Sequence, residues 1–382
     1  MRGQANGTQR LLKPEKFMST PDPLKSNWSR WDAHRQALAL TVTDPGTDVL
    51  EQAIAWLSGN DGLQRVEFLA WHGLAPWWAD QLVRSRNIDR VPPTVAAALR
   101  GQRRTASALY LTQTHALHEV STALEQHAIP YVVFKGAAAR EAVYASPSLR
   151  VAGDIDLLVR ADARATVAAL LARSGFNEQL QVRASAHEST FTRGRVDIDL
   201  HWDILRPGRT RLPLVDSILA ERVRGDRFTH PCDTDSVFLM LVHPAFTKYV
   251  CSANMGLNRV LDFLLFTRGC VIDWPAVARR LDDAGMKTAG WCTLRWMQMV
   301  SPSSLAVPAE FMVDIAPGAL RRTYLERWLV HDLPGRLLDR TDWLIRTAFT
   351  LPLHDRPADA WRAIRARIGN QSHREGEGFR TL

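Results

Sequence analysis

Four aspartates in two Asp-x-Asp pairs are the residues whose types and spacing most directly suggest chemistry. Asp154 and Asp156 stand in GDIDLLV, and Asp197 and Asp199 stand in VDIDLH. Side chains two residues apart on a β-strand point to the same face, so each pair places two carboxylates side by side. Such close like charges are costly unless a cation lies between them, and carboxylate oxygens suit Mg²⁺ or Mn²⁺. The pairs therefore predict a divalent-metal site.

The second pair could complete a three-carboxylate site. If its strand lies beside the first, one of its aspartates would join Asp154 and Asp156 around two metal ions roughly 4 Å apart, the arrangement used for in-line phosphoryl displacement. Strand periodicity does not choose between Asp197 and Asp199, because both point to the same face.

Basic residues upstream of the first pair are candidates for binding phosphate. Lys135 and Gly136 follow the apolar run IPYVVF and precede the helix-forming run AAAREAVYA, so backbone N–H groups and the helix dipole there can face phosphate oxygens. Arg150 lies four residues before Asp154, and its guanidinium is as compatible with phosphate as with a structural ion pair to the acidic cluster. Lys135 and Gly136 are therefore predicted to bind the nucleotide, with Arg150 as a candidate helper.

Three further residues are accessory candidates. His201 shares a strand face with Asp199 and could contact substrate or the surroundings of a metal, although a packed, hydrogen-bonded histidine is the favoured interpretation. His243 and Lys248 lie on or near one helix in LVHPAFTKYV, where Pro244 predicts a kink or break. Both could close a nucleotide pocket.

The elements that must position these residues form a compact α/β core of the α+β class. Strands are predicted at IPYVVF and DIDLLV, and a hairpin is predicted in HESTFTRGRVDIDLHWDI with its turn at residues 193–195. Between them, ARATVAALLARSG predicts a helix closed by Gly175.

Changes in the spacing of apolar residues along the sequence predict six segments. Residues 1–27 lack periodicity and are predicted to be a disordered leader, and residues 371–382 a flexible tail. Apolar residues three and four apart predict an N-terminal helical region at 28–128, a helical domain at 208–300 and a C-terminal helical region at 301–370. The catalytic core is expected at 129–207.

The overall composition is that of a folded, soluble protein with an anionic partner. The chain of 382 residues is 46% hydrophobic and 23% charged, with a formal charge of +8. Because the positive charge is spread along the chain, nucleic acid is a lesser expectation than nucleotide, without being excluded. The N-terminal residues lack an apolar signal core, and no run reaches the about 18 apolar residues that a bilayer span needs. We therefore expect a cytoplasmic protein with no transmembrane segment.

Four cysteines complete the inventory of reactive residues: Cys232, Cys251, Cys270 and Cys292. They show no Cys-x-x-Cys pairing and no nearby histidine at zinc spacing, which argues against a cysteine-based zinc site. We expect buried, reduced thiols.

Three segments taken together resemble a nucleotidyltransferase family within the polymerase-beta-like superfamily. They are FKGAAAREAVYASPSLRVAGDIDLLV, VDIDLHWDI and LNRVLDFLLFTRGCVIDW. In that family an Arg precedes Asp-x-Asp, a Lys-Gly turn replaces the Gly-Ser turn of better-studied relatives, and a carboxylate stands just before a Leu-His-Trp run. The resemblance spans Tyr131 to Val300, and neither the N-terminal helices nor the residues after about Pro302 carry a specific match.

The resemblance implies a small mixed sheet flanked by helices, dependence on Mg²⁺ (or Mn²⁺), and transfer of a nucleoside monophosphate from an NTP, expected to be ATP. It selects Asp199 over Asp197 as the third ligand, because Asp199 stands in the family's place. It does not imply the acceptor, which could be a small molecule, a peptide or a protein. The hydroxyl of the Gly-Ser turn is absent, and Lys135 could compensate for it.

The resulting hypothesis is that Asp154 and Asp156 bind both metal ions. Asp199 would bind the ion that activates an acceptor hydroxyl for attack on the α-phosphorus. Two alternatives stay open. The same carboxylates would suit a metal-dependent phosphotransferase, and a nonenzymatic nucleotide-binding sensor or scaffold would bind nucleotide without turnover.

Overall fold

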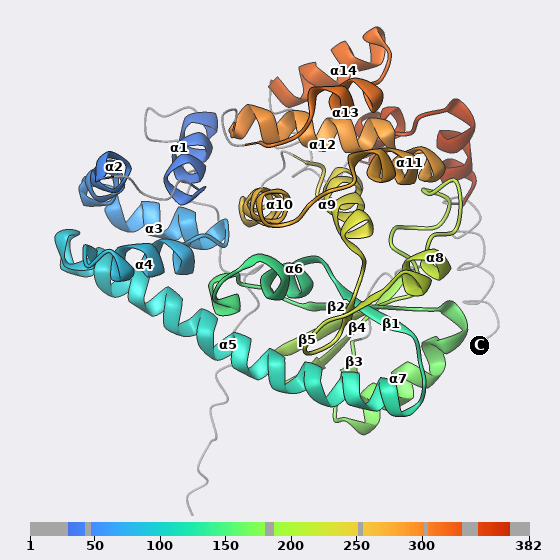
Figure 1. The fold of residues 1–382 in the computed structure, drawn as a ribbon, viewed down its shortest axis with the longest axis horizontal. Helices are drawn as coiled ribbons and strands as arrows, with labels where there is room; N and C mark the ends of the chain where they lie inside the picture. The colour runs from blue at the N-terminus through green and yellow to red at the C-terminus, as the bar shows by residue number, and fades with distance from the viewer. Residues whose placement is uncertain are drawn as a thin grey trace, which may run out of the picture.

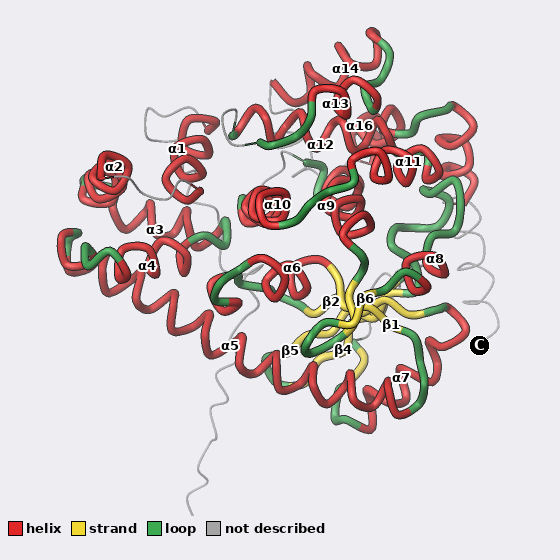
Figure 2. Tube along the Cα trace, in the orientation of Figure 1, coloured by secondary structure: helices red, strands yellow, loops and turns green. Residues whose placement is uncertain are grey.

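The computed structural model describes residues 30–42, 47–179, 187–250, 255–301, 305–330 and 343–366. The predicted leader at 1–27 and the predicted tail at 371–382 lie outside the described residues. Helices surround one five-stranded sheet, as Figure 2 shows by element type. The α+β class predicted from the sequence is confirmed.

In the described part of the chain, five α-helices precede the sheet. They are α1 (Arg30–Val42), α2 (Thr47–Ser58), α3 (Gly62–Trp71), α4 (Ala75–Arg84) and, after the 3-10 helix η2 (Ile88–Arg90), α5 (Pro93–Gln126). Proline suits the first position of α5, because an N–H group there has no partner within the helix. With 34 residues, α5 is about 51 Å long and extends from the N-terminal helices to the sheet (Figure 1).

The large sheet is mixed and has the strand order β1-β2-β5-β4-β3. Its strands are β1 (Tyr131–Phe134), β2 (Ile155–Val159), β3 (Asn177–Glu178), β4 (Glu188–Arg193) and β5 (Val196–His201). β2 and β5 pair in parallel, and the other neighbours pair antiparallel. β4 and β5 form the predicted hairpin, in which Gly194 has a φ of 62° that favours glycine.

The two faces of this sheet pack against different elements. Leu157 and Leu200 belong to a buried cluster with the second half of α5 and with α7 (Arg164–Arg173). Because side chains alternate along a strand, Asp156, Asp199 and His201 stand on the opposite face. That face lies toward α6 (Lys135–Val143) and the C-terminal helices (Figure 1).

The helices that follow the sheet make up the C-terminal part of the described chain. They are α8 (Val215–Ala220), α9 (Asp233–Thr247), α10 (Asn258–Gly269), α11 (Trp274–Ala284), α12 (Lys287–Val300), α13 (Ala309–Asp314), α14 (Ala319–Val330), α16 (Trp343–Thr350) and a helical stretch at 357–366. Shorter elements are η3 (Pro147–Leu149), η4 (Ala161–Ala163), η5 (Leu351–Leu353) and the paired strands β6 (Val223–Arg224) and β7 (Thr229–His230). One apolar core runs through both N-terminal and C-terminal helices. In the described part of the chain, no helix combines the length and apolar character that a bilayer crossing needs.

The cysteines differ in part from expectation. Cys292 is buried within α12, as predicted. Cys232 and Cys270 are only partly buried, because each stands at an end of a helix rather than inside one. All three are free thiols, and Cys251 lies outside the described residues.

A buried ion pair joins the sheet region to α10. Arg150 donates from Nε and Nη2 to both carboxylate oxygens of Asp262, at 2.6 to 3.1 Å. Tyr144 donates its hydroxyl to the same carboxylate at 2.8 Å. A Cβ added to Gly136 would stand 2.8 Å from Nη1 of Arg150, so the glycine of the Lys-Gly turn leaves room for the guanidinium. Through Asp262, α10 is thus joined to Tyr144 at the end of α6 and to Arg150 in the segment before β2.

Candidate active site

The pairing of β2 and β5 brings the carboxylates together. In their parallel register Asp156 stands directly beside Asp199. Asp154 comes just before β2 rather than within it, which corrects the expectation that one strand carries both residues of the first pair. The chain bends at that point, yet Asp154 lines the same cavity as Asp156 and Asp199.

Lys135 and His201 compensate the charge of Asp156. Nζ of Lys135 donates to Oδ1 of Asp156 at 2.5 Å, and Nε2 of His201 lies 2.9 Å from the same oxygen. Burial alone would raise the pKa of Asp156, but the charge of Lys135 and the contact with His201 hold it well below its ordinary value. Asp156 is therefore ionised at neutral pH.

Lys135 reaches Asp156 from an unusual backbone conformation. Its φ of 57° lies in the left-handed region, which costs a residue with a side chain about 1–2 kcal/mol. It stands at the junction where β1 passes into α6, as the sequence predicted. Strain kept at such a junction is typical of a functional site.

Among the residues that the structure describes, neither Asp154 nor Asp199 forms an ion pair of the kind that Lys135 forms with Asp156. Burial and the charge of Asp156 raise the pKa of Asp154. Burial and the charge of Asp154 raise the pKa of Asp199 to about 6, although Thr190 donates a hydrogen bond to Asp199 at 2.6 Å. Keeping both groups ionised therefore costs free energy, which a bound cation would offset.

The donor set fits a hard divalent cation. Asp156, Asp199 and His201 each place one ligand atom within 4.8 Å of the others. Asp154 adds a further carboxylate that is exposed to the cavity. Clustered carboxylate oxygens of this kind are the ligands that Mg²⁺ and Mn²⁺ take in proteins.

Gln113 of α5 holds the loop that precedes Asp154. Its buried Nε2 donates to the carbonyl of Ala152 at 3.0 Å, and its Oε1 accepts from Nη1 of Arg140 at 2.6 Å. Arg140 belongs to α6, the helix that begins with Lys135. One buried amide therefore links the two segments that present Lys135 and Asp154.

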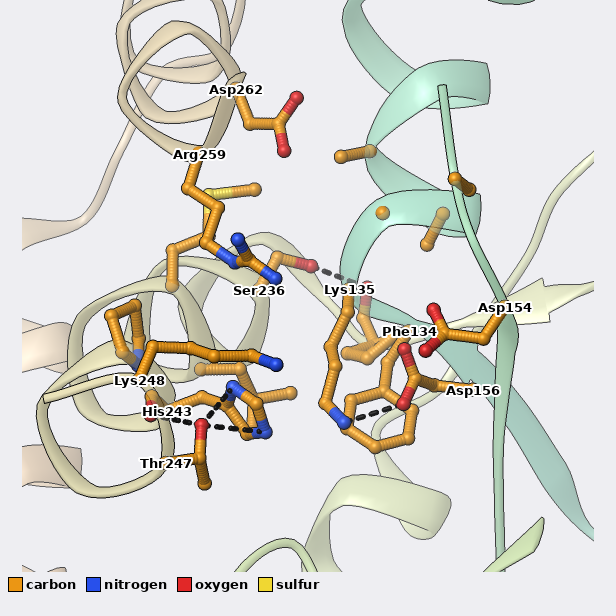
Figure 3. A pocket seen from close by; sticks show the side chains of 18 of the residues that line it. Phe134, Lys135, Asp154, Asp156, Ser236, His243, Thr247, Lys248, Arg259 and Asp262 are labelled. Carbon is orange, nitrogen blue, oxygen red and sulfur yellow. Dashed lines mark hydrogen bonds and ion pairs between the residues drawn. The ribbon is translucent and has the colours of Figure 1, made fainter. Parts of the chain in front are cut away.

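Lys135 and the three aspartates line a cavity of about 710 Å³ between the sheet and the C-terminal helices. The far wall includes His243 on α9, Lys248 at its end and Arg259 on α10. In Figure 3 the side chains of Lys248 and Arg259 extend from their helices toward Lys135 and the aspartates. A cavity of this size is within the range of small-ligand sites.

The far wall is basic. Burial and the charge of Arg259 lower the pKa of Lys248, and burial and the charge of Arg150 lower the pKa of Arg259. Burial, assisted by Lys135, lowers the pKa of His243 well below its ordinary value, so this imidazole is neutral at pH 7. Within the part of the chain that the structure describes, Arg259 has no carboxylate partner. Lys248 and Arg259 repel each other, so an anion bound between them would stabilise both charges.

The sequence matches a known protein family over a region that includes the cavity. A family model described as an uncharacterised nucleotidyltransferase matches residues 63–300, more than half of the chain. The chain belongs to this nucleotidyltransferase family. No curated protein matches the chain.

The nucleotidyltransferase match also corrects the expected extent of the resemblance. It begins at residue 63 rather than at Tyr131, so α3, α4 and α5 belong to the family region. The reason is structural, since α5 packs on the sheet and carries Gln113 to the loop before Asp154. α9 and α10, which form the basic wall, lie within the match as well.

Two of the predicted site residues, Asp197 and Arg150, do not face the carboxylate cluster with a free side chain. Asp197 does not line the cavity, and it accepts a hydrogen bond from Thr192 at 2.6 Å. Arg150 lines the cavity, but its guanidinium is held by Asp262. Its partner is therefore on α10 rather than in the acidic pairs.

Sequence reasoning did not single out Arg259, His187 or Glu188, all of which line the cavity. For Glu188 the predicted hairpin gave the wrong register. Counting back from a turn at residues 193–195 pairs Glu188 with Leu200, whereas Arg193 pairs with Val196 in the structure and Glu188 stands opposite His201. Arg259 carried no local signal, because its position depends on how α10 packs over the sheet.

Asp199→Asn should stabilise the metal-free nucleotidyltransferase near neutral pH. The folded state raises the pKa of Asp199 to about 6. The protonated side chain therefore costs the folded state nothing near pH 4, whereas its ionisation lowers the free energy of unfolding as the pH rises through about 6. The amide removes the charge and can still accept from Thr190. The melting temperature in a chelator at about pH 7.5 should rise by about 2 °C or more, with a smaller rise near pH 4.

Added Mg²⁺ provides the control for this prediction. It should raise the melting temperature of the wild type more than that of Asp199→Asn, because the variant has lost a ligand. A metal-free variant that melts below the wild type at neutral pH would contradict the assignment.

Proposed function

We propose that the protein transfers a nucleoside monophosphate from an NTP, expected to be ATP, to a hydroxyl acceptor and releases pyrophosphate. The distribution of charge across one cavity carries this proposal. Asp154, Asp156 and Asp199 line one side, and Lys248 and Arg259 line the other. A triphosphate bound together with divalent cations complements both walls at once.

Asp154, Asp156 and Asp199 are the residues that would hold Mg²⁺ (or Mn²⁺). The raised pKa values of Asp154 and Asp199 support this role, because they indicate negative charge that the protein itself does not neutralise. When bound, the metal would supply stabilisation of charge on the phosphates and a lower pKa for the acceptor hydroxyl.

Lys135, Lys248 and Arg259 are placed to bind the triphosphate. Lys135 would exchange Asp156 for a phosphate oxygen once the carboxylates are neutralised, since it lies 2.5 Å from that carboxylate and lines the cavity. Arg259 presents a fork of donors suited to phosphate. Backbone N–H groups at Gly136, in the first turn of α6, would add further donors.

The proposed reaction is a single displacement at the α-phosphorus. The acceptor oxygen forms a bond to phosphorus as the bond to the bridging oxygen breaks, the hydroxyl proton passes to water, and pyrophosphate leaves. The protein contributes positioning and charge stabilisation rather than a covalent intermediate. His243, neutral beside Lys248, can hydrogen-bond to the substrate without adding charge.

Label transfer tests this proposal directly. Purified protein incubated with Mg²⁺ or Mn²⁺ and each α-³²P-labelled NTP, alone and with cell extract, should transfer label and release pyrophosphate. Asp156→Asn should lower the rate by at least about 100-fold, the scale of losing one group that stabilises the transition state. Asp197→Asn is the matched control on the same sheet face and should keep the wild-type rate.

The products separate the alternatives. Release of ADP or inorganic phosphate would favour a metal-dependent phosphotransferase. Nucleotide binding without turnover would favour a sensor or scaffold. Equal loss of transfer in Asp156→Asn and Asp197→Asn would contradict the assignment of the site.

Arg259→Ala should raise the KM for the NTP about 10-fold to 100-fold, because a charged hydrogen bond worth about 1.5–3 kcal/mol is lost. Arg259→Lys should recover part of the effect by keeping the charge. Arg268→Ala, an exposed arginine on the same helix, should leave KM unchanged. An unchanged KM in Arg259→Ala would remove Arg259 from the nucleotide site.

A further inference from the structure

His201 has one ring nitrogen that serves the candidate active site and one that does not. Nε2 lies 2.9 Å from Oδ1 of Asp156 and 3.4 Å from Nζ of Lys135, so both of its neighbours belong to that site. His201 is 0% exposed, and among the described residues its Nδ1 has no hydrogen-bond partner. A buried nitrogen of this kind calls for a proton donor or a cation.

A carboxylate faces this nitrogen. Oε2 of Glu188 lies 3.3 Å from Nδ1 of His201 without forming a hydrogen bond to it. The antiparallel register of β4 and β5 pairs Glu188 with His201, so the two side chains project from the same face. A cation bound to both atoms would satisfy the buried nitrogen and compensate the charge of the carboxylate.

His187 supplies a third donor atom. Its Nε2 lies 3.6 Å from the same oxygen of Glu188, and the residue is 5% exposed. The neutral imidazole is a common metal ligand. One ligand atom from each of His187, Glu188 and His201 lies within 4.8 Å of the others.

These separations match a small tetrahedral ion. Ligand atoms about 2.1 Å from a tetrahedral zinc ion stand about 3.4 Å apart. The two distances to Oε2 of Glu188 are 3.3 and 3.6 Å. The third pair of ligand atoms, on His187 and His201, lies within 4.8 Å.

We propose that His187, Glu188 and His201 form a transition-metal site, best suited to Zn²⁺, that is distinct from the carboxylate site for Mg²⁺. Two imidazoles and one carboxylate form a donor set that favours zinc over hard cations. The fourth position is open to water or a substrate atom, because Glu188 is half-buried and lines the cavity.

This site would act on the catalytic carboxylates through His201. A metal on Nδ1 keeps the proton on Nε2, and Nε2–H donates to Asp156, which is the carboxylate–histidine–metal arrangement that orients ligands in known sites. The ion would thereby fix the orientation of Asp156. His187 and Glu188 are positioning residues in this scheme.

A second cluster of donor atoms provides a contrast. Glu221, Cys232 and Asp235 also lie within 4.8 Å of one another. However, Arg280 donates to both oxygens of Asp235, at 2.6 and 2.9 Å, so a cation already occupies that cluster. Cys232 is therefore a useful control residue.

Retention of zinc in excess Mg²⁺ tests the proposal on the full chain. After exposure to Zn²⁺ and dialysis against excess Mg²⁺, the wild type should retain one zinc per chain by elemental analysis. Co²⁺ bound in its place should show the visible absorption of a tetrahedral site. His187→Gln and Glu188→Gln should each weaken zinc binding by about 100-fold or more, beyond the cost of losing a supporting residue.

Two further variants make the result specific. Cys232→Ser should retain zinc, and so should Asp154→Asn, even though the proposed function predicts that Asp154→Asn loses nucleotidyl transfer. Loss of transfer and loss of zinc are thus separate readouts. A wild type that retains no zinc would overturn the proposal whether or not the variants fold, as would full zinc retention in folded His187→Gln and Glu188→Gln.

Discussion

Repulsion among three carboxylates is the constraint around which the rest of the site is arranged. The parallel pairing of β2 and β5 places Asp156 beside Asp199, with Asp154 at the entrance to β2. Lys135 compensates the charge of Asp156, which His201 also contacts, while the pKa values of Asp154 and Asp199 stay raised by burial and by neighbouring negative charge. Apolar residues at these positions would make a more stable sheet. The fold therefore gives up stability here, which is typical of a site that binds cations.

The surrounding elements hold the carboxylates at a set distance from the basic wall. The buried pair of Arg150 and Asp262 ties the segment before β2 to α10, which carries Arg259, and Tyr144 at the end of α6 donates to the same carboxylate. Gly136 leaves space for that pair, and Gln113 connects α6 to the loop before Asp154. The α5 helix thus contributes to the site although none of its residues lines the cavity. This explains in physical terms why the nucleotidyltransferase family region includes the helices upstream of the sheet.

Local pattern was enough to predict the strands, the Lys-Gly junction, the hairpin and the α+β class, because each depends on periodicity or turn chemistry within a few residues. It could not separate Asp197 from Asp199, since the two share a strand face and only the neighbouring elements distinguish them. It left Arg150 between two roles because its partner, Asp262, is 112 residues away in the chain. Arg259 was missed for the same reason, since helix packing brings it to the cavity.

The most direct test of the central claim is anomalous diffraction from crystals grown with Mn²⁺ and a nonhydrolysable NTP analogue. Manganese should give one or two peaks in contact with Asp154, Asp156 and Asp199, with the triphosphate between these carboxylates and Arg259. Lys135 should have left Asp156 for a phosphate oxygen. Analogue bound elsewhere, or manganese with no contact to Asp156 and Asp199, would contradict the claim that this cavity binds a metal-bound triphosphate.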